Sequence, residues 1–208
     1  MGRKEAAMRR ITVLIFVASL LGSVSAVSAQ SFVGTEVKIS ESNKPVALID
    51  GWFEATRKVG PEPANSEVDR RQALGAFIWA FSTPGFSEVY AGPVWYPTPN
   101  IELSFGVGIE NADKPLRMGT AFLYLGAEYT VFSAYENGGS GYWYKVTVTK
   151  KVAGRWSAGF HSRRFSPTGP LFEYRPNGRY TIWTAFGPDI EPRERPLKLV
   201  VGLNVGLP

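Results

Sequence analysis

The sequence of 208 residues contains no cysteine and only one histidine. Disulfide frameworks, cysteine-type zinc sites and thiol catalysis all need cysteine, and a histidine metal cluster needs more than one histidine. We therefore expect no metal, no cofactor and no disulfide. Helical periodicity is also nearly absent after residue 45, so the sequence lacks the signal of a helical domain.

The sequence has a single long apolar run, from Ile11 to Leu21, and this run is too short for the roughly 20 residues of a transmembrane helix. It is followed by the small residues Val27-Ser28-Ala29 and is preceded by four basic residues, namely Arg3, Lys4, Arg9 and Arg10. This order is typical of a secretory signal peptide. We expect a signal peptide over 1–29, a polar N-terminal lead-in over 30–45, and one domain over 46–208.

Removal of the signal peptide is a first testable expectation. Mass spectrometry of the exported protein should find a chain that begins at Gln30, because the small residues before it fit a signal-peptidase site. An exported chain that keeps residues 1–29 would contradict the assignment. Cleavage removes four of the 23 basic residues and one of the 18 acidic ones, so the formal net charge falls from +5 to about +2. The remaining charge gives no argument for nucleic-acid binding.

From Pro45 onward, apolar and polar residues alternate in short runs that are separated by Gly, Pro, Asn and Asp. The alternation is strict over 101–110, and over 197–207 only Val200 breaks it. Weaker alternation marks further strands at 46–57, 74–82, 86–96, 142–152, 155–165, 170–176 and 179–187. Segment 116–136 is either one long strand or two strands divided at Gly126. Pro93 inside 86–96 predicts a bulge or a shorter strand.

The connections between these strands are mostly short. Tight turns are predicted at 83–85, 111–115, 153–154 and 176–178, and looser connections at 58–69, 97–100, 137–141, 166–169 and 188–196. With 116–136 as one strand, tight turns and loops alternate between the two ends, and loops 58–69 and 188–196 are expected on the exterior. The pattern predicts an all-β fold, an antiparallel up-and-down meander β-barrel of 8–10 strands.

An exported chain of such strands resembles the class of small bacterial outer-membrane β-barrels. The final strand carries the most specific part of the resemblance, because Gly202, Val205 and Leu207 fit the spacing of the class's terminal signal. Two positions depart from it: Val200 replaces a polar residue, and the chain ends in Leu207-Pro208 where the class favours Phe or Trp. The resemblance implies the cell outer membrane as location and a porin-like function. It implies membrane lipid and, through the last strand, the assembly machinery as partners, and no nucleic acid; a small ligand at the exterior loops stays open.

All six Trp and all nine Tyr lie after the signal segment. Many of them fall at strand ends, namely Trp95, Tyr96, Tyr142 to Tyr144, Trp156, Tyr174 and Tyr180. Rings with one polar edge favour the boundary between membrane and water. We therefore expect these aromatic residues to form girdles around the barrel.

If the apolar faces contact lipid, the charged residues of the opposite faces point into the lumen. The expected acidic residues are Asp50, Glu54, Glu88, Glu102, Glu110, Glu128 and Glu173, and the expected basic ones are Lys145, Lys151, Arg155, Arg163, Arg175, Arg179 and Lys198. Acids come mainly from the first half of the barrel and bases from the second. Opposed walls should then pair across a narrow interior, for example Glu102 and Glu128 with Arg163 and Arg179. This predicts a structural or narrow-pore protein without enzymatic activity.

Two other functions stay open. Alternation cannot distinguish inside from outside, so the chain could be a soluble exported lipocalin-like barrel, periplasmic or secreted, that binds a hydrophobic ligand. The second is an outer-membrane lipid hydrolase, because His161-Ser162 resembles the His-x-Ser arrangement of the lipid A 3-O-deacylases. Neighbouring strand residues point to opposite faces, however, and the residue two positions after His161 is Arg163.

Overall fold

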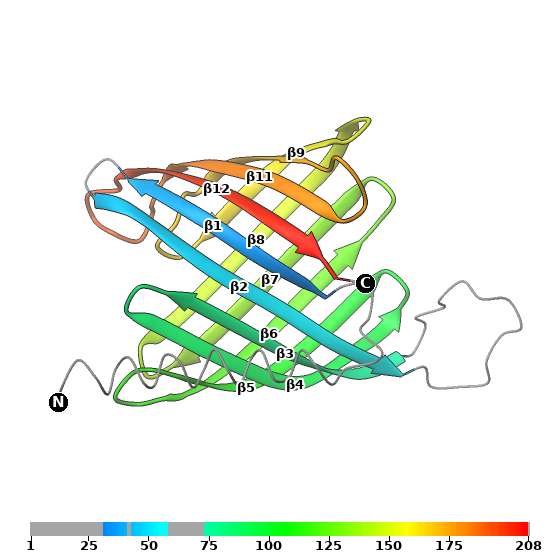
Figure 1. The fold of residues 1–208 in the computed structure, drawn as a ribbon, viewed down its shortest axis with the longest axis horizontal. Helices are drawn as coiled ribbons and strands as arrows, with labels where there is room; N and C mark the ends of the chain where they lie inside the picture. Colours follow the sequence, from blue (N-terminus) through cyan, green and yellow to red (C-terminus); the bar gives the residue numbers. More distant parts are fainter. Residues whose placement is uncertain (1–30, 41–42, 58–72, 208) are drawn as a thin grey trace, which may run out of the picture.

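The computed structural model describes residues 31–40, 43–57 and 73–207, which form one closed antiparallel barrel (Figure 1). Its twelve strands are β1 (Phe32–Ser40), β2 (Asn43–Arg57), β3 (Ala73–Thr83), β4 (Phe86–Thr98), β5 (Ile101–Glu110), β6 (Leu116–Leu125), β7 (Tyr129–Gly138), β8 (Gly141–Ala153), β9 (Trp156–Arg163), β10 (Gly169–Tyr174), β11 (Tyr180–Pro188) and β12 (Leu197–Gly206). Each strand pairs with the next, and β1 pairs with β12. The predicted all-β meander barrel is confirmed. The predicted signal peptide lies outside the described residues.

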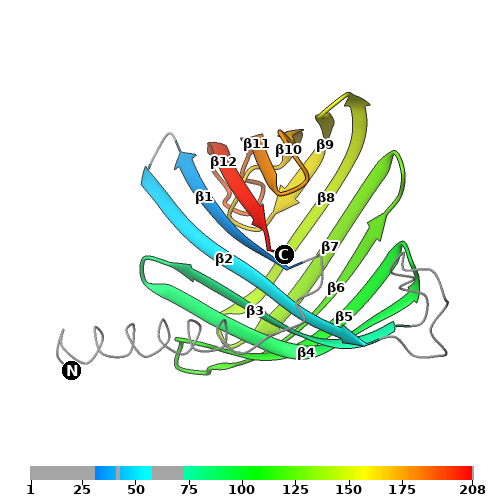
Figure 2. The ribbon, with the colours of Figure 1, turned by 45° about the vertical axis from the view of Figure 1, so that its right-hand side comes forward.

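Closure of the barrel depends on the pairing of β1 with β12. This ladder extends from Phe32 opposite Gly206 to Ser40 opposite Lys198, and Leu207 N donates one more hydrogen bond to Ser31 O at 2.8 Å. Figure 2 shows the end of β12 beside the start of β1. We call the end of the barrel that holds Phe32 and Gly206 the terminal end, and the opposite one the distal end. A closed sheet leaves no edge strand whose backbone groups lack partners.

Within the described part of the chain, no helix is long and apolar enough to cross a membrane.

The barrel has twelve strands, where 8–10 were predicted. One additional strand is β1, which occupies most of the segment 30–45 that we expected as a lead-in; polar residues such as Glu36 and Lys38 there alternate with Val37 and Ile39. The other arises because 116–136 forms two strands, β6 and β7, joined by a turn over 126–128. Gly126 N closes this turn by donating to Tyr129 O at 2.8 Å.

The additional turn at 126–128 changes the end of the barrel at which the later connections lie. β2 ends with Arg57 at the terminal end, since Trp52 is paired with Phe32. Residues 189–196 instead join β11 to β12 at the distal end, next to Ser40. The expectation that loops 58–69 and 188–196 share the exterior face is therefore wrong, although residues 58–69 themselves lie outside the described residues.

Pro93 does not shorten its strand. β4 continues to Thr98, and Pro93 keeps its place opposite Ala76 of β3. On the other side, the ladder with β5 is interrupted over residues 92–93, and the change of register comes between Trp95 and Thr98. Proline lacks the N–H that this ladder would need. The strand keeps its length and, of the two predicted alternatives, an irregularity of the bulge type follows Pro93.

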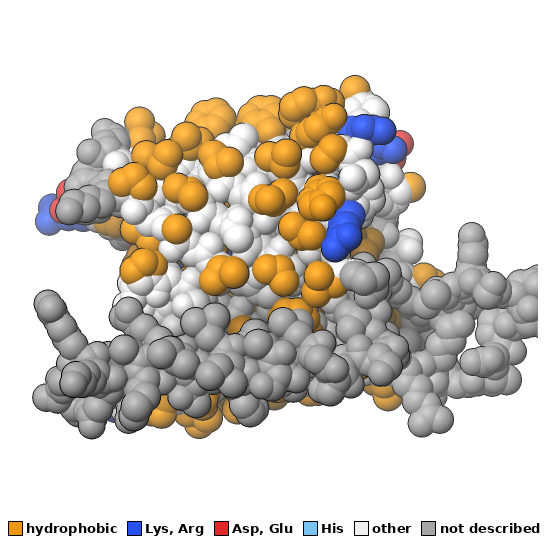
Figure 3. Space-filling view, in the orientation of Figure 1, with side chains coloured by type: hydrophobic (Ala, Val, Ile, Leu, Met, Phe, Trp, Pro, Cys, Tyr) orange, Lys and Arg blue, Asp and Glu red, His pale blue; other side chains and the backbone are white. Residues whose placement is uncertain are grey.

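The outer wall of the barrel is apolar. On β5 the outward residues Leu103, Phe105, Val107 and Ile109 are all exposed, and Figure 3 shows hydrophobic side chains spread over the visible wall. On β12, Val201 is 44% exposed whereas its neighbour Val200 is fully buried. Soluble barrels turn polar residues outward. The arrangement seen here is the one expected of a barrel whose wall contacts lipid.

Large aromatic side chains fill much of the interior. Trp52 stacks on Phe77 with ring centroids 4.2 Å apart, and Trp79 lies 5.5 Å from Tyr90 and 6.5 Å from Trp143. Ordinary side chains fill the interior of an eight-stranded barrel, and the diameter grows with the number of strands. Rings from several strands are therefore needed to occupy the wider lumen of twelve strands.

Inward glycines make room for these rings. A Cβ built on Gly108 of β5 would lie 2.8 Å from the ring of Tyr90, and one on Gly202 of β12 would lie 2.3 Å from the ring of Trp183. A larger residue at Gly202 would displace the indole of Trp183, and one at Gly108 would clash with the ring of Tyr90 and also with the carbonyl oxygen of Val89, at 2.4 Å. The glycine that we assigned to the terminal signal, Gly202, thus also has a packing role inside the lumen.

Candidate binding site in the barrel lumen

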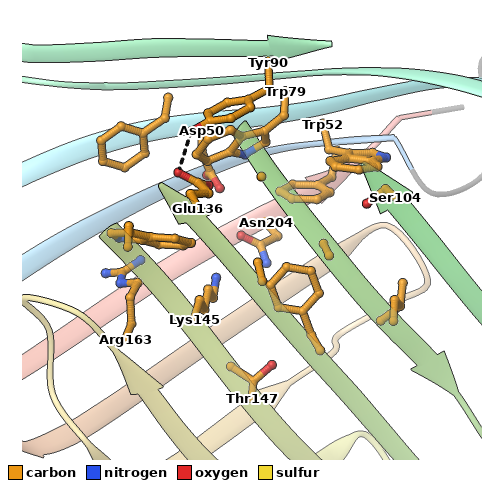
Figure 4. Close-up of a pocket in the computed structure, with 18 of the residues that line it drawn as sticks. Asp50, Trp52, Trp79, Tyr90, Ser104, Glu136, Lys145, Thr147, Arg163 and Asn204 are labelled. Atoms are coloured by element: carbon orange, nitrogen blue, oxygen red, sulfur yellow. Dashed lines mark hydrogen bonds between the residues drawn. The ribbon is translucent and has the colours of Figure 1, made fainter. Parts of the chain in front are cut away.

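A cavity of about 350 Å³ lies inside the barrel. This volume falls within the roughly 300 to 1,000 Å³ that is usual for small-molecule sites. The aromatic side chains that line it are Phe32, Trp52, Phe77, Trp79, Phe81, Tyr90, Phe132, Trp143 and Trp183. Figure 4 shows part of this lining, with Trp52, Trp79 and Tyr90 on one side and Lys145 and Arg163 on the other. The cavity thus combines flat apolar surfaces with a small polar region.

The structure separates the residues expected in aromatic girdles into two groups: Trp95, Tyr142, Trp156 and Tyr180 are exposed, as expected, whereas Trp143 lines the cavity. Of the six Trp, four line the cavity, and only Trp95 and Trp156 are exposed on the outer wall. Tyr96, which we also expected at the membrane boundary, is almost fully buried. Aromatic residues at strand ends can face either side of a wall, and proximity to a strand end does not determine the direction of the side chain.

The polar region of the cavity comes from two neighbouring strands, β8 and β9. Lys145 lies directly opposite Arg163 across the ladder, and Thr147 lies opposite His161. All four side chains line the cavity. We call them the β8–β9 patch. Directly opposed residues on one face lie within about 5.5 Å of one another at Cβ, so the patch presents its polar groups together.

The two cations of the β8–β9 patch differ in their partners. Arg163 Nη1 donates to Glu36 Oε1 at 2.9 Å, and its Nη2 lies 2.6 Å from Glu36 Oε2. Lys145 has no such carboxylate among the described residues: its Nζ lies 5.7 Å from the ring centroid of Trp183 and 5.8 Å from that of Phe132. Lys145 is therefore the cation of the patch that is available to a ligand.

His161 is a buried group of the patch whose ring nitrogens lack hydrogen-bond partners among the residues that the structure describes. Its ring lies 5.8 Å from that of Trp183. Buried polar atoms normally have partners, because an unsatisfied one costs about 1 to 3 kcal/mol. His161 therefore adds an unused donor and acceptor to the wall of the cavity.

A separate charge cluster surrounds Arg117 near the distal end. The guanidinium lies 2.7 Å from Glu110, 3.2 Å from Glu88 and 3.3 Å from Glu136. Its Nε also donates to Tyr90 Oη at 2.6 Å, and Tyr90 Oη donates to Glu136 at 2.9 Å. All five side chains are nearly inaccessible to solvent. One buried guanidinium thus contacts three carboxyl groups. We call Arg117, Tyr90 and these three glutamates the Arg117 cluster.

A third group of polar contacts lies near the terminal end. Tyr96 Oη lies 2.6 Å from Glu54 Oε1 and 3.0 Å from Glu102 Oε2, and Trp52 Nε1 donates to Glu54 at 3.3 Å. The backbone N–H of Glu54 donates to Ser31 Oγ at 3.0 Å. These contacts connect β2, β4, β5 and Ser31, the residue before β1, so they hold one side of the lumen together.

The predicted lumen residues fall into three locations. Those inside the barrel are Asp50, Glu54, Glu88, Glu102, Glu110, Glu173, Lys145 and Arg163. Those at the terminal end, where they are exposed or line a shallow pocket between turns, are Glu128, Lys151, Arg155, Arg175 and Arg179. Lys198 lies at the distal end and forms an ion pair with Asp189. The rim residues sit at the ends of strands, where a side chain can reach water.

Among the described residues, the structure does not contain the expected ion pairs of Glu102 and Glu128 with Arg163 and Arg179, so that prediction is wrong. Glu102 contacts Tyr96, Glu128 and Arg179 lie at the rim, and Arg163 binds Glu36. Sequence reasoning missed Glu36 because it lies in the segment without a predicted strand. It missed Arg117 because a single strand over 116–136, with Glu128 inward, turns Arg117 outward, whereas the turn over 126–128 shifts the parity of the first half. Glu136 has the same parity as Glu128, so the single strand already predicted an inward direction for it, and this residue was overlooked. Both side chains face inward.

His161 and Ser162 do not form a catalytic pair. Ser162 Oγ lies 3.0 Å from Thr168 Oγ1, and neither nitrogen of His161 contacts a hydroxyl. This agrees with the opposite directions of neighbouring side chains on a strand. Within the described residues, no group of three or more His, Asp or Glu could hold a metal ion.

No family model matches the sequence. No curated protein matches it either. Among solved structures, the KdgM porin has a TM-score of 0.50 and 10% identity, over 85% of this chain and 99% of that chain. KdgM in complex with disordered oligogalacturonate has a TM-score of 0.50 and 9% identity over the same shares. The outer membrane protein Omp33 of Acinetobacter baumannii has a TM-score of 0.50 and 11% identity, over 86% of this chain and 98% of that chain. The predicted resemblance to outer-membrane β-barrels is therefore confirmed at the level of the fold, which this chain shares with porins.

Proposed function

We propose that this protein is an outer-membrane β-barrel that acts as a narrow pore for small solutes and has no enzymatic activity. The observation that carries the proposal is the apolar outer wall around an interior that contains buried charges. Such a wall is stable against lipid tails and unfavourable against water. The porin-like fold of the similar structures supports the same location.

The contents of the lumen favour a narrow passage over a wide one. Rings from β2, β3, β4 and β8 meet inside the barrel, and the Arg117 cluster occupies one side of it near the distal end. Wide porins instead leave an aqueous channel between 16 or more strands. A small cavity between large side chains admits small solutes only.

Membrane location and conduction can be tested on the full chain. We expect the protein in the outer-membrane fraction, with faster gel migration before boiling than after it, because a closed barrel resists detergent. In planar bilayers we expect small single-channel conductance, well below that of a wide porin measured alongside. Recovery in the soluble fraction would overturn the membrane location. Insertion with no conductance would overturn the pore and leave a structural role, and large conductance would overturn the narrow lumen.

A further inference from the structure

We infer that the lumen cavity is a binding site for a small monoanion with an apolar ring body, that is, an aromatic carboxylate. The inference deepens the proposed function, since it names the class of solute that the same lumen would hold. Its evidence is the combination of flat apolar walls, one cation without a carboxylate partner, and a buried imidazole without a hydrogen-bond partner.

The walls of the cavity select the body of the ligand. Trp79 of β3 and Trp143 of β8 have ring centroids 6.5 Å apart. The rings of Trp183 and Phe132 lie close to the amine of Lys145. Aromatic rings favour offset or edge-to-face contacts with a second ring at about 4.5 to 7 Å. A planar apolar ring therefore finds contacts on several sides, whereas a ligand covered with hydroxyls would leave polar atoms against indoles.

The β8–β9 patch selects the charge of the ligand. A cation inside a protein is costly unless an anion compensates it. Among the described residues Lys145 has ring contacts and no carboxylate at ion-pair distance, and the charges of Asp50 and Glu36 act on it only from farther away. A ligand carboxylate beside Lys145 supplies that anion. Thr147 and His161 occupy the next pair of positions along the two strands and can donate to the same carboxylate.

The acidic residues around the cavity limit the ligand to one negative charge. Glu136 is bound by Arg117 and Tyr90, and Glu102 accepts from Tyr96. Asp50 also lines the cavity, and the described residues give it no ion pair. Its carboxylate on the facing wall repels a second ligand charge, so a dianion is disfavoured relative to a monoanion.

The test measures binding by calorimetry on the purified full chain in detergent, separately from conduction. Three probes separate the contributions of the ligand's ring and of its charge. 2-Naphthoate has an apolar ring and a negative charge, 2-naphthamide has the apolar ring without the charge, and galacturonate has the charge on a polar ring. We expect naphthoate to bind at least about tenfold more tightly than either of the others. Equal affinity for naphthoate and naphthamide would overturn the role of Lys145, and tighter binding of galacturonate would overturn the apolar body.

Three variants assign the site. Lys145→Gln should remove the preference for naphthoate over naphthamide, whereas Lys150→Gln, an exposed lysine five positions along the same strand, should keep it. Asp50→Asn should strengthen naphthoate binding several-fold, because a repelling charge is lost. Binding that is indifferent to both Lys145 and Asp50 reflects partition into detergent and overturns the inference. Conductance without naphthoate binding would contradict the proposed ligand and agree with the proposed pore. Naphthoate binding without conductance would contradict the pore and agree with the ligand.

Discussion

Replacing Arg117 with leucine should lower the free energy of unfolding by about 3 to 5 kcal/mol, the cost of removing one partner from a buried ion pair. The reason is the composition of the Arg117 cluster, in which one guanidinium serves Glu88, Glu110 and Glu136. Without it, three carboxyl groups that lack access to water must stay charged without a cation or take up protons. Denaturant titration of the barrel in lipid vesicles, followed by tryptophan fluorescence, measures the change.

A matched control separates burial from charge. Arg175 also contacts a glutamate, Glu173, at 3.1 Å, but its side chain is 49% exposed. Arg175→Leu should therefore change the free energy of unfolding by less than about 1 kcal/mol. Adding Glu110→Gln to Arg117→Leu should cost less than the sum of the single changes, since fewer orphan carboxylates remain. Additive costs, or equal costs at Arg117 and Arg175, would mean that the cluster is solvated and that the lumen is open water.

The strands that the sequence predicted well are those with one polar and one apolar face. In β5, the inward Glu102, Ser104 and Glu110 are polar, whereas the residues that alternate with them on the outer wall are apolar. Alternation alone was therefore enough to predict the strand and the direction of its side chains. β12 shows the same pattern except at Val200. The structure explains this exception, because Val200 packs inside the barrel in a cluster with Leu171 and Trp183.

The parts of the site that could not be predicted are those where the inward face is itself apolar. β2 turns Leu48 and Trp52 toward the lumen beside Asp50, so hydrophobicity does not distinguish its two faces. The same holds for Trp79 on β3. Assigning such residues to lipid or lumen requires the register of the neighbouring strands, which depends on contacts far apart in the sequence. For this reason the aromatic cavity was missing from the sequence prediction, although its cation Lys145 was present in it.

The sequence prediction was also limited by the alternation of inward and outward side chains along the chain. A turn of a few residues can exchange the inward and outward faces of all that follows, and the turn over 126–128 carries only a weak signal, a single Gly126 among otherwise strand-compatible residues. Because the sequence prediction lacked this turn, it turned the side chain of Arg117 outward and placed the later loops at the wrong end of the barrel. Charged residues at strand ends are a further ambiguity, since Glu128 and Arg179 lie where both the rim and the lumen are within reach.

Placing arginine at Val201 should lower the free energy of unfolding by about 2 to 4 kcal/mol and impair assembly of the barrel. Val201 lies near the middle of β12 on the apolar outer wall, next to the equally outward Leu203. A charge at mid-bilayer depth loses its hydration, and the compensation available to it is limited to snorkelling and local water defects. Leu203→Arg should behave in the same way. Denaturant titration in lipid vesicles, together with the heat-dependent gel shift of membrane fractions, measures both effects.

The control is Asn204→Arg on the opposite face of the same strand. Asn204 lines the lumen cavity, where an arginine can reach water or the carboxylate of Asp50, so its cost should be clearly smaller than that of Val201→Arg. The comparison also separates the membrane barrel from a soluble one. On a water-exposed wall, Val201→Arg would stay within about 0.5 kcal/mol of the unmodified protein, as surface substitutions usually do. Equal tolerance of arginine at Val201 and Asn204 would therefore remove the physical basis for placing this wall in lipid.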